Sequence, residues 1–115
     1  MTTTTLTNHK SETQLTTAEV ALVSTSSSEK KYLGMFSVTN TSESTVDVTF
    51  WRIGDSVTGV EGVGGNWIFS KGIAAKESVR MDKIMGHMLG NSMKISGKAE
   101  VAAVINIDIS GTTEV

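Results

Sequence analysis

The chain carries few residues of the types that do chemistry. Histidine occurs only at His9 and His87, with no His-x-His or His-x-x-x-His pair. A metal site needs several nitrogen or oxygen ligands converging on one ion, and a single nearby carboxylate, Asp82, does not complete such a set. We therefore predict no metal site, and we expect both histidines at the surface or at an interface.

The sequence gives equally little support for a catalytic nucleophile or a catalytic pair of carboxylates. Serine is abundant, but no Gly-x-Ser-x-Gly motif marks a catalytic turn, and the absence of cysteine excludes thiol catalysis and cysteine-based zinc sites. The Gly-rich segment 59–65 lacks the Gly-Lys-Ser/Thr ending of a phosphate-binding loop. Several acidic residues fall in loops or on polar strand faces, where we expect them to be solvated: Asp47, Asp55, Glu61, Asp82 and Asp108. The sequence predicts no enzyme and no cofactor.

Size and charge restrict the kinds of protein to which the chain can belong. The chain has 115 residues, enough for one domain, and a formal net charge of −2. A nucleic-acid-binding protein normally has a basic surplus, which is missing here. No apolar run approaches the length of a membrane span, and the N-terminus lacks the pattern of a signal peptide. We expect neither a nucleic-acid nor a membrane partner, and no glycan on the Asn40-Thr41-Ser42 sequon.

The elements that would position any functional residue are predicted to be β-strands. In FSVTNTSESTVDVTFW (36–51), apolar and polar residues alternate on both sides of a polar turn. This period of two predicts strands over 31–40 and 45–53. It places Val46, Val48 and Phe50 on one face, with Trp51 on the other. In the first of these strands it places Tyr32, Gly34, Phe36 and Val38 on a common face.

Further strands are predicted over 15–23, 66–70, 78–85, 93–96 and 100–110. The last contains Val101, Ala103, Ile105, Ile107 and Ile109 at alternate positions. Residues 71–89 also contain helix-favouring Ala, Lys, Glu and Met, but the alternation around Val79 and Met81 favours a strand. Seven or eight short, regularly spaced strands predict an all-β protein, a single antiparallel β-sandwich of the jelly-roll or immunoglobulin-like kind. Residues 1–13, polar and without period, predict a flexible N-terminal arm ahead of a domain over 14–115.

Four segments of this pattern resemble small all-β virion proteins of tailed bacteriophages. They are VTNTSESTVDVTFW (38–51), GIAAKESVRMDKI (72–84), LGNSMKIS (89–96) and VAAVINIDISG (101–111). The resemblance spans roughly residues 15–111 and concerns strands and turns rather than chemical signatures. The chain departs from the pattern at Asn91, where Asp is frequent.

The resemblance implies a structural part of the virion, first of all a capsid decoration, or cement, protein. Such a protein would be made in the host cytoplasm, bind the major capsid protein on the outer capsid surface as a dimer or trimer, and bridge neighbouring capsomers. The alternatives are a tail, neck or baseplate component and a carbohydrate-binding sandwich that uses Trp51 and Trp67.

Candidate contact residues follow from exposure and residue type. An unstructured arm can add a strand to a partner's sheet, which suggests Thr3, Thr4, Thr5 and Leu6. Trp51 either packs beneath a loop or anchors an interface, since tryptophan is enriched in binding hot spots. Among the methionines, Met81 and Met93 suit core filling, whereas Met88 in a Gly-bounded turn suits a contact surface.

Overall fold

The computed structural model of the chain describes residues 3–54, 67–82, 84–86 and 88–115. These residues contain no helix and form nine strands: β1 (Thr4–Gln14), β2 (Val20–Ser24), β3 (Lys30–Asn40), β4 (Val46–Gly54), β5 (Trp67–Ile73), β6 (Ser78–Arg80), β7 (Met88–Leu89), β8 (Met93–Ala99) and β9 (Ile105–Glu114). The prediction of an all-β protein is confirmed.

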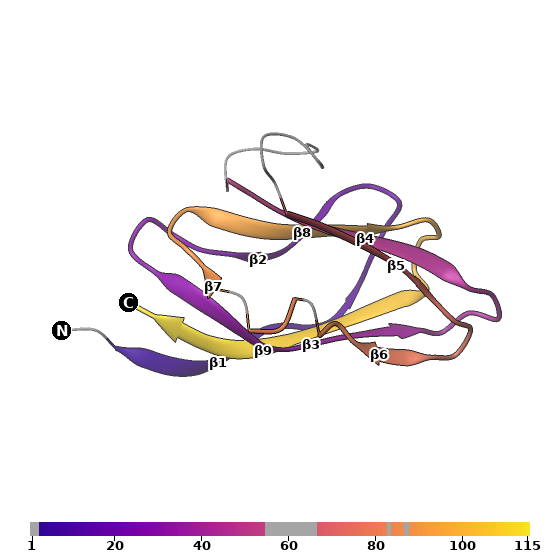
Figure 1. The fold of residues 1–115 in the computed structure, drawn as a ribbon, viewed down its shortest axis with the longest axis horizontal. Coiled ribbons are helices and arrows are strands. Elements are labelled where there is room, and N and C mark those ends of the chain that lie inside the picture. Colours follow the sequence, from indigo (N-terminus) through magenta and orange to yellow (C-terminus); the bar gives the residue numbers. More distant parts are fainter. Residues whose placement is uncertain (1–2, 55–66, 83, 87) are drawn as a thin grey trace.

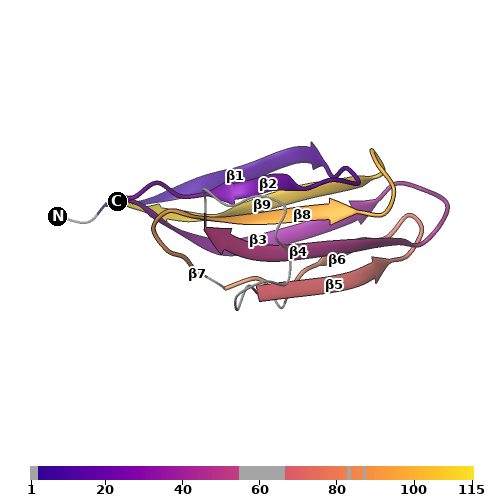
Figure 2. The ribbon, with the colours of Figure 1, turned by 90° about the horizontal axis from the view of Figure 1, so that it is seen from above.

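The strands form two antiparallel sheets that pack face to face as two layers (Figure 1). Sheet A has the order β1-β9-β3-β6, with the short β7 also paired to β3, and sheet B has the order β2-β8-β4-β5. Seen from above, β1 lies along one side of the molecule and β5 along the opposite side (Figure 2). The predicted antiparallel β-sandwich is therefore the observed architecture.

The pairing of the strands identifies the connectivity as a jelly roll. β1 pairs with β9, β2 with β8, β3 with β6 and β4 with β5, so the first strand meets the last and the pairs proceed inward along the chain. This is the arrangement expected when one long antiparallel ribbon rolls up into two sheets. Of the two sandwich types that the sequence allowed, the structure has the jelly roll.

The core lies between the sheets and is built from alternate residues, as predicted. Val46, Val48 and Phe50 of β4 are buried, and so are Ile105, Ile107 and Ile109 of β9. The two layers meet at Phe36 of β3 and Phe50 of β4, whose ring centroids are 5.0 Å apart in an edge-to-face geometry. Met81 is buried in the same core and Met93 packs against it, which confirms their predicted role.

A β-bulge changes the faces predicted for β3. The register of β3 against β9 shifts between Leu33 and Met35. Leu33 is consequently buried, whereas Met35 is exposed and Tyr32 pairs with the outward-facing Thr112. One inserted residue reverses which side chains face the core. Tyr32 and Gly34 thus do not share the inward face of Phe36 and Val38, and that prediction is wrong.

The N-terminal segment is a strand of the domain rather than a loose arm. β1 pairs with β9 from Thr4 opposite Glu114 to Gln14 opposite Asn106. The pairing begins even earlier, because the backbone N–H groups of Thr3 and Val115 each donate to the other's carbonyl oxygen at 2.9 Å. The physical reason is that β9 has backbone groups along this side that need partners, and a Thr-rich segment without proline supplies them.

Two other predicted strands have different bounds from those expected: β9 begins and ends later than 100–110, and β6 ends earlier than 78–85. β9 begins at Ile105, and the residues before it form a turn in which Val101 is exposed and Ala103 has a positive φ of 63°. β6 covers only Ser78–Arg80 and is followed by turns that bury Met81 and Ile84. Alternation alone did not reveal these turns, because a turn can also place apolar residues at every second position.

The sequon asparagine serves the fold. Asn40 is fully buried, and its Nδ2 donates hydrogen bonds to the carbonyl oxygens of Ser44 and Ile73, both at 2.8 Å. Its Oδ1 accepts from the backbone N–H and the Oγ of Ser42, at 2.9 and 2.7 Å. This amide ties the turn between β3 and β4 to the end of β5, and its burial leaves it inaccessible to modification in the folded chain.

We expect Gly97→Ala to destabilise the sandwich. An added Cβ would lie 2.7 Å from Cδ1 of Phe50 and 3.2 Å from Cδ1 of Leu22. Overpacking of this kind in a filled core costs about 1–3 kcal/mol. The control is Gly90→Ala, where the nearest atom is Sδ of Met93 at 3.9 Å. Chemical denaturation measures both, and equal stability of the two variants would contradict the packing described here.

A second prediction separates two residues that the sequence placed on one strand face. Ile105→Asp puts an unpaired charge in the core and should lower the free energy of unfolding by roughly 3–5 kcal/mol. Val101→Asp lies in the exposed turn and should change it by no more than about 0.5 kcal/mol. Thermal melts followed by circular dichroism test the pair. Similar losses for both variants would mean that the start of β9 is misplaced.

Candidate interaction surface

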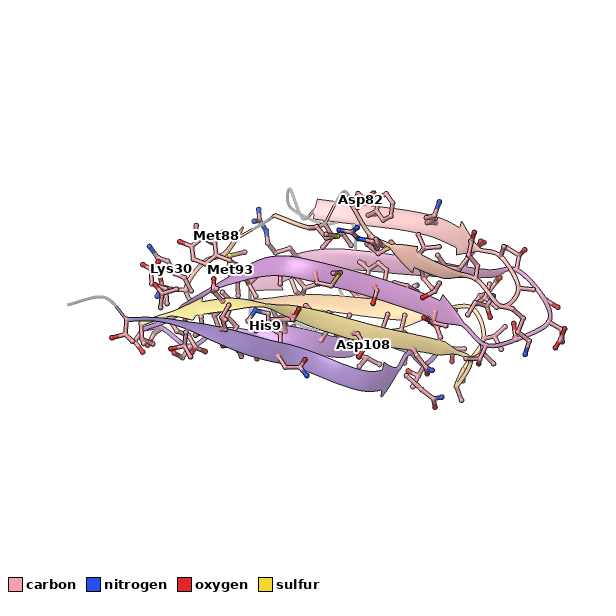
Figure 3. The ribbon with its side chains drawn as sticks, turned by 90° about the horizontal axis from the view of Figure 1, so that it is seen from below. His9, Lys30, Asp82, Met88, Met93 and Asp108 are labelled. Atoms are coloured by element: carbon pink, nitrogen blue, oxygen red, sulfur yellow. The ribbon has the colours of Figure 1, made fainter. Side chains whose placement is uncertain are left out.

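The structure separates the predicted contact residues into two groups. Those of the N-terminus lie along the free side of sheet A, and Met88 lies in β7 of the same sheet; Trp51 belongs to sheet B. Figure 3 looks onto the outer face of sheet A, with Asp108 on the middle strand β9 and Met88 toward the end that carries the termini. The first group comprises Thr3, Thr4, Thr5, Leu6 and Met88.

The outer face of sheet A follows from the registers of its strands. Leu6 is opposite Thr112, Asn8 is opposite Ser110, and Ser110 is also opposite Met35. These positions alternate with the buried isoleucines of β9, so their side chains point away from sheet B. Leu6 is 86% exposed and Met35 is 41% exposed. Two large apolar side chains therefore stand on this Thr- and Ser-rich part of the face, and Met88 of β7, opposite Tyr32 and also 41% exposed, is a third on the same sheet.

A groove lies between the Leu6 and Met35 side chains. It has a volume of about 780 Å³ and is lined by residues 6–8 of β1, Gly34 and Met35 of β3 and residues 108–112 of β9. It exists because the bulge in β3 brings two glycines together at its floor. A Cβ on Gly111 would collide with the carbonyl oxygen of Tyr32, and a Cβ on Gly34 would touch the Gly111 backbone. Small floor residues thus lie beneath the exposed Leu6 and Met35 side chains.

Trp51 does not belong to this surface. It is 1% exposed and lies outside the core cluster, on the face of β4 opposite to Val48 and Phe50. Of the two alternatives considered for this residue, burial is the one observed. Its ring is therefore covered in this structure, and a contact role for Trp51 stays a prediction. Trp67 begins β5, and the position of its side chain lies outside the described features.

The outer side of sheet B carries buried polar groups that the sequence did not indicate. Lys94 is 5% exposed, and its Nζ lies 3.7 Å from a carboxylate oxygen of Glu19. Nε1 of Trp51 and Oγ of Ser96, on paired residues of β4 and β8, are buried without a hydrogen-bond partner in the described structure. A buried ion pair requires two distant segments to meet, which no local pattern reveals. We take the outer face of sheet A, which carries the groove and the exposed Leu6 and Met35, as the candidate interaction surface.

His9, expected at the surface or at an interface, is half-buried and contacts a neighbouring strand. It lies at a bulge in β1, and its Nε2 is 3.1 Å from the carbonyl oxygen of Tyr32 in β3, so the ring reaches across β9. Its Nδ1 is buried without a partner among the described residues. Burial lowers the pKa of His9 below 6.5, and the positive charge of Lys31 lowers it further, against the raising effects of the Tyr32 hydrogen bond and of Glu29.

The remaining residues with reactive side chains do not gather into one site among the described residues. Asp47, Asp82 and Asp108 are exposed, as predicted. Among the described residues no three or more His, Cys, Asp or Glu side chains gather as a metal site would require. Within the same residues the structure has no helix long and apolar enough to cross a bilayer. The predictions for His87, Asp55, Glu61 and the Gly-rich segment 59–65 lie outside the described residues.

Comparisons with known proteins give distant structural likenesses. No protein-family model and no curated protein sequence matches the chain. Solved structures that match include the coat protein of Tobacco streak virus, with 14% identity, a TM-score of 0.47 and coverage of 98% of this chain and 85% of that one. Infectious bursal disease virus, Gx strain, matches with 10% identity and a TM-score of 0.38, and the VP2 subviral particle of that virus with 14% and 0.33. The chain spans 32% and 31% of those two chains.

The low pKa of His9 predicts a dependence of stability on pH. The folded chain binds a proton at His9 less readily than the unfolded chain does, so protons favour unfolding. This contribution to stability is complete above pH 6.5 and is lost as the pH falls through the lower folded pKa. Thermal midpoints measured over this range should fall more steeply for the wild type than for His9→Gln. His87 is present in both proteins and cancels in the comparison; equal slopes would contradict the assignment.

Proposed function

We propose that this chain is a structural protein of a bacteriophage virion, and specifically a capsid decoration, or cement, protein. Its partner would be the major capsid protein, which it binds on the outer capsid surface after synthesis in the host cytoplasm. It would act as a homo-oligomer that bridges capsomers, without catalysis, a cofactor, nucleic acid or a membrane. Its work is adhesion.

The observation that carries this proposal is the jelly-roll connectivity, from β1 with β9 inward to β4 with β5. Jelly rolls are a recurrent architecture of viral capsid domains, and they also occur in lectins and cupins. The strand and turn segments that resemble phage virion proteins lie on this framework, from the end of β3 through β9. One fold serves many functions, so the proposal also rests on the features of the protein surface.

The outer face of sheet A has features that suit binding to another protein. Leu6 and Met35 flank a groove of about 780 Å³ on a rigid, hydrogen-bonded sheet. An apolar side chain of a shell protein would gain by leaving water there, because burying a large aliphatic side chain contributes about 1.5–3 kcal/mol. Neighbouring Thr, Ser and Asn side chains can hydrogen-bond around such an anchor. Repeated over the symmetry of a shell, a modest contact per copy raises the barrier to separating capsomers.

Microscopy of purified particles tests the location. We expect cryo-electron microscopy to show this sandwich on the capsid lattice, with sheet A toward the shell, and densitometry to give hundreds of copies per particle. A few tens of copies or fewer, located on the tail, neck or baseplate, would replace decoration by that alternative. Complete absence from particles would overturn the virion role.

A surface variant tests the groove. Met35→Glu places a charge beside the groove on an exposed position and should weaken binding to undecorated shells at least about tenfold, through lost apolar burial and a desolvated charge. Val101→Glu, a similarly exposed residue in the turn before β9, is the matched control and should bind normally. Equal binding by both variants, with unchanged melting, would remove sheet A from the interface.

A further inference from the structure

The free side of β1 presents backbone groups in a defined order. β1 ends the path of sheet A in the described chain, and β9 lies on its other side. Thr3 and Val115 exchange two backbone hydrogen bonds, and the register continues without a shift from Thr4 to Asn8. In an antiparallel pair, bonded and non-bonded residues alternate. Thr5 and Thr7 therefore bond to β9, whereas the N–H and C=O groups of Thr4 and Leu6 point outward.

From this order we propose that two copies of this chain pair antiparallel through β1, about a twofold axis at Leu6. Leu6 then lies opposite Leu6 of the second copy, and the two residues exchange both of their outward backbone hydrogen bonds. Thr4 lies opposite Asn8 on either side. Sheet A of one copy continues into sheet A of the other. This pairing names the contact of the proposed homo-oligomer and rests on that part of the proposed function.

Three features favour a second copy over an extended segment of another protein. Residues 4–8 (TTLTN) carry no charge, so antiparallel self-pairing brings no like charges together. The pairing sets the 86% exposed Leu6 side chain against its own symmetry mate. The apolar strip from Met35 to Leu6 then continues across the axis onto the second copy.

The bulges in β1 limit the length of the contact. The register against β9 shifts between Asn8 and Lys10 and again between Lys10 and Thr13. Bulges twist an edge and interrupt the spacing that an added strand needs. A long strand from another protein could not follow β1 from end to end, whereas a short symmetric contact over residues 4–8 needs only the regular part.

Cysteine cross-linking tests the register, and the natural chain contains no cysteine to interfere. Under mild oxidation Leu6→Cys should form a covalent dimer, because directly opposite residues lie within disulfide reach. Thr5→Cys alone should not, since Thr5 lies diagonally from Thr5 of the second copy, about 7–8 Å away. A mixture of Thr5→Cys and Thr7→Cys should cross-link, because these positions face each other. Cross-linking of Thr5→Cys alone, or none by Leu6→Cys, overturns this register.

Sedimentation tests the dimer itself without any disulfide. The wild type should sediment as a dimer, and Leu6→Lys should weaken dimerisation at least about tenfold, because charged edge residues oppose strand pairing. Val101→Lys is the exposed control and should remain dimeric. A wild type that is monomeric at every concentration overturns the proposal. These measurements need no capsid. If the chain does not dimerise, the proposed binding of the shell beside Met35 can still be tested by itself.

Discussion

The whole molecule depends on the close packing of two sheets across one apolar layer. Phe36 of sheet A meets Phe50 of sheet B at a centroid distance of 5.0 Å, and the absence of a side chain at Gly97 leaves room for the Phe50 ring. The isoleucines of β9 and the valines of β4 complete the layer. Every surface feature is positioned by this layer, because it fixes which face of each strand remains outside.

The two outer faces differ in a way that matters for function. On sheet B, Trp51 and Lys94 are buried. On sheet A, the bulge in β3 and the glycines at positions 34 and 111 leave a groove between exposed Leu6 and Met35. The same element therefore breaks the regularity of the sheet and shapes the groove. β1 adds an edge whose outward backbone groups can bind another strand, while its bulges restrict the length of that contact.

His9 links this edge to the rest of sheet A. Its ring crosses β9 to reach the Tyr32 carbonyl, next to the bulge that shapes the groove. Burial favours the neutral form, as the lowered pKa indicates. The edge strand is thus held by backbone pairing along β9 and by one side chain whose charge state depends on pH. The outer face of sheet A and its β1 edge are thus connected through His9.

The sequence by itself determined the fold class, most of the strands and the inward residues of β4 and β9. It could do so because alternation with period two is a local consequence of strand geometry. It did not determine that Leu33 replaces Tyr32 and Gly34 on the inner face, since a bulge depends on the partner strand. Nor did it determine that residues 4–14 pair with β9, that Trp51 is covered or that Lys94 meets Glu19. These outcomes join segments far apart in the chain, and only the tertiary structure brings such segments together.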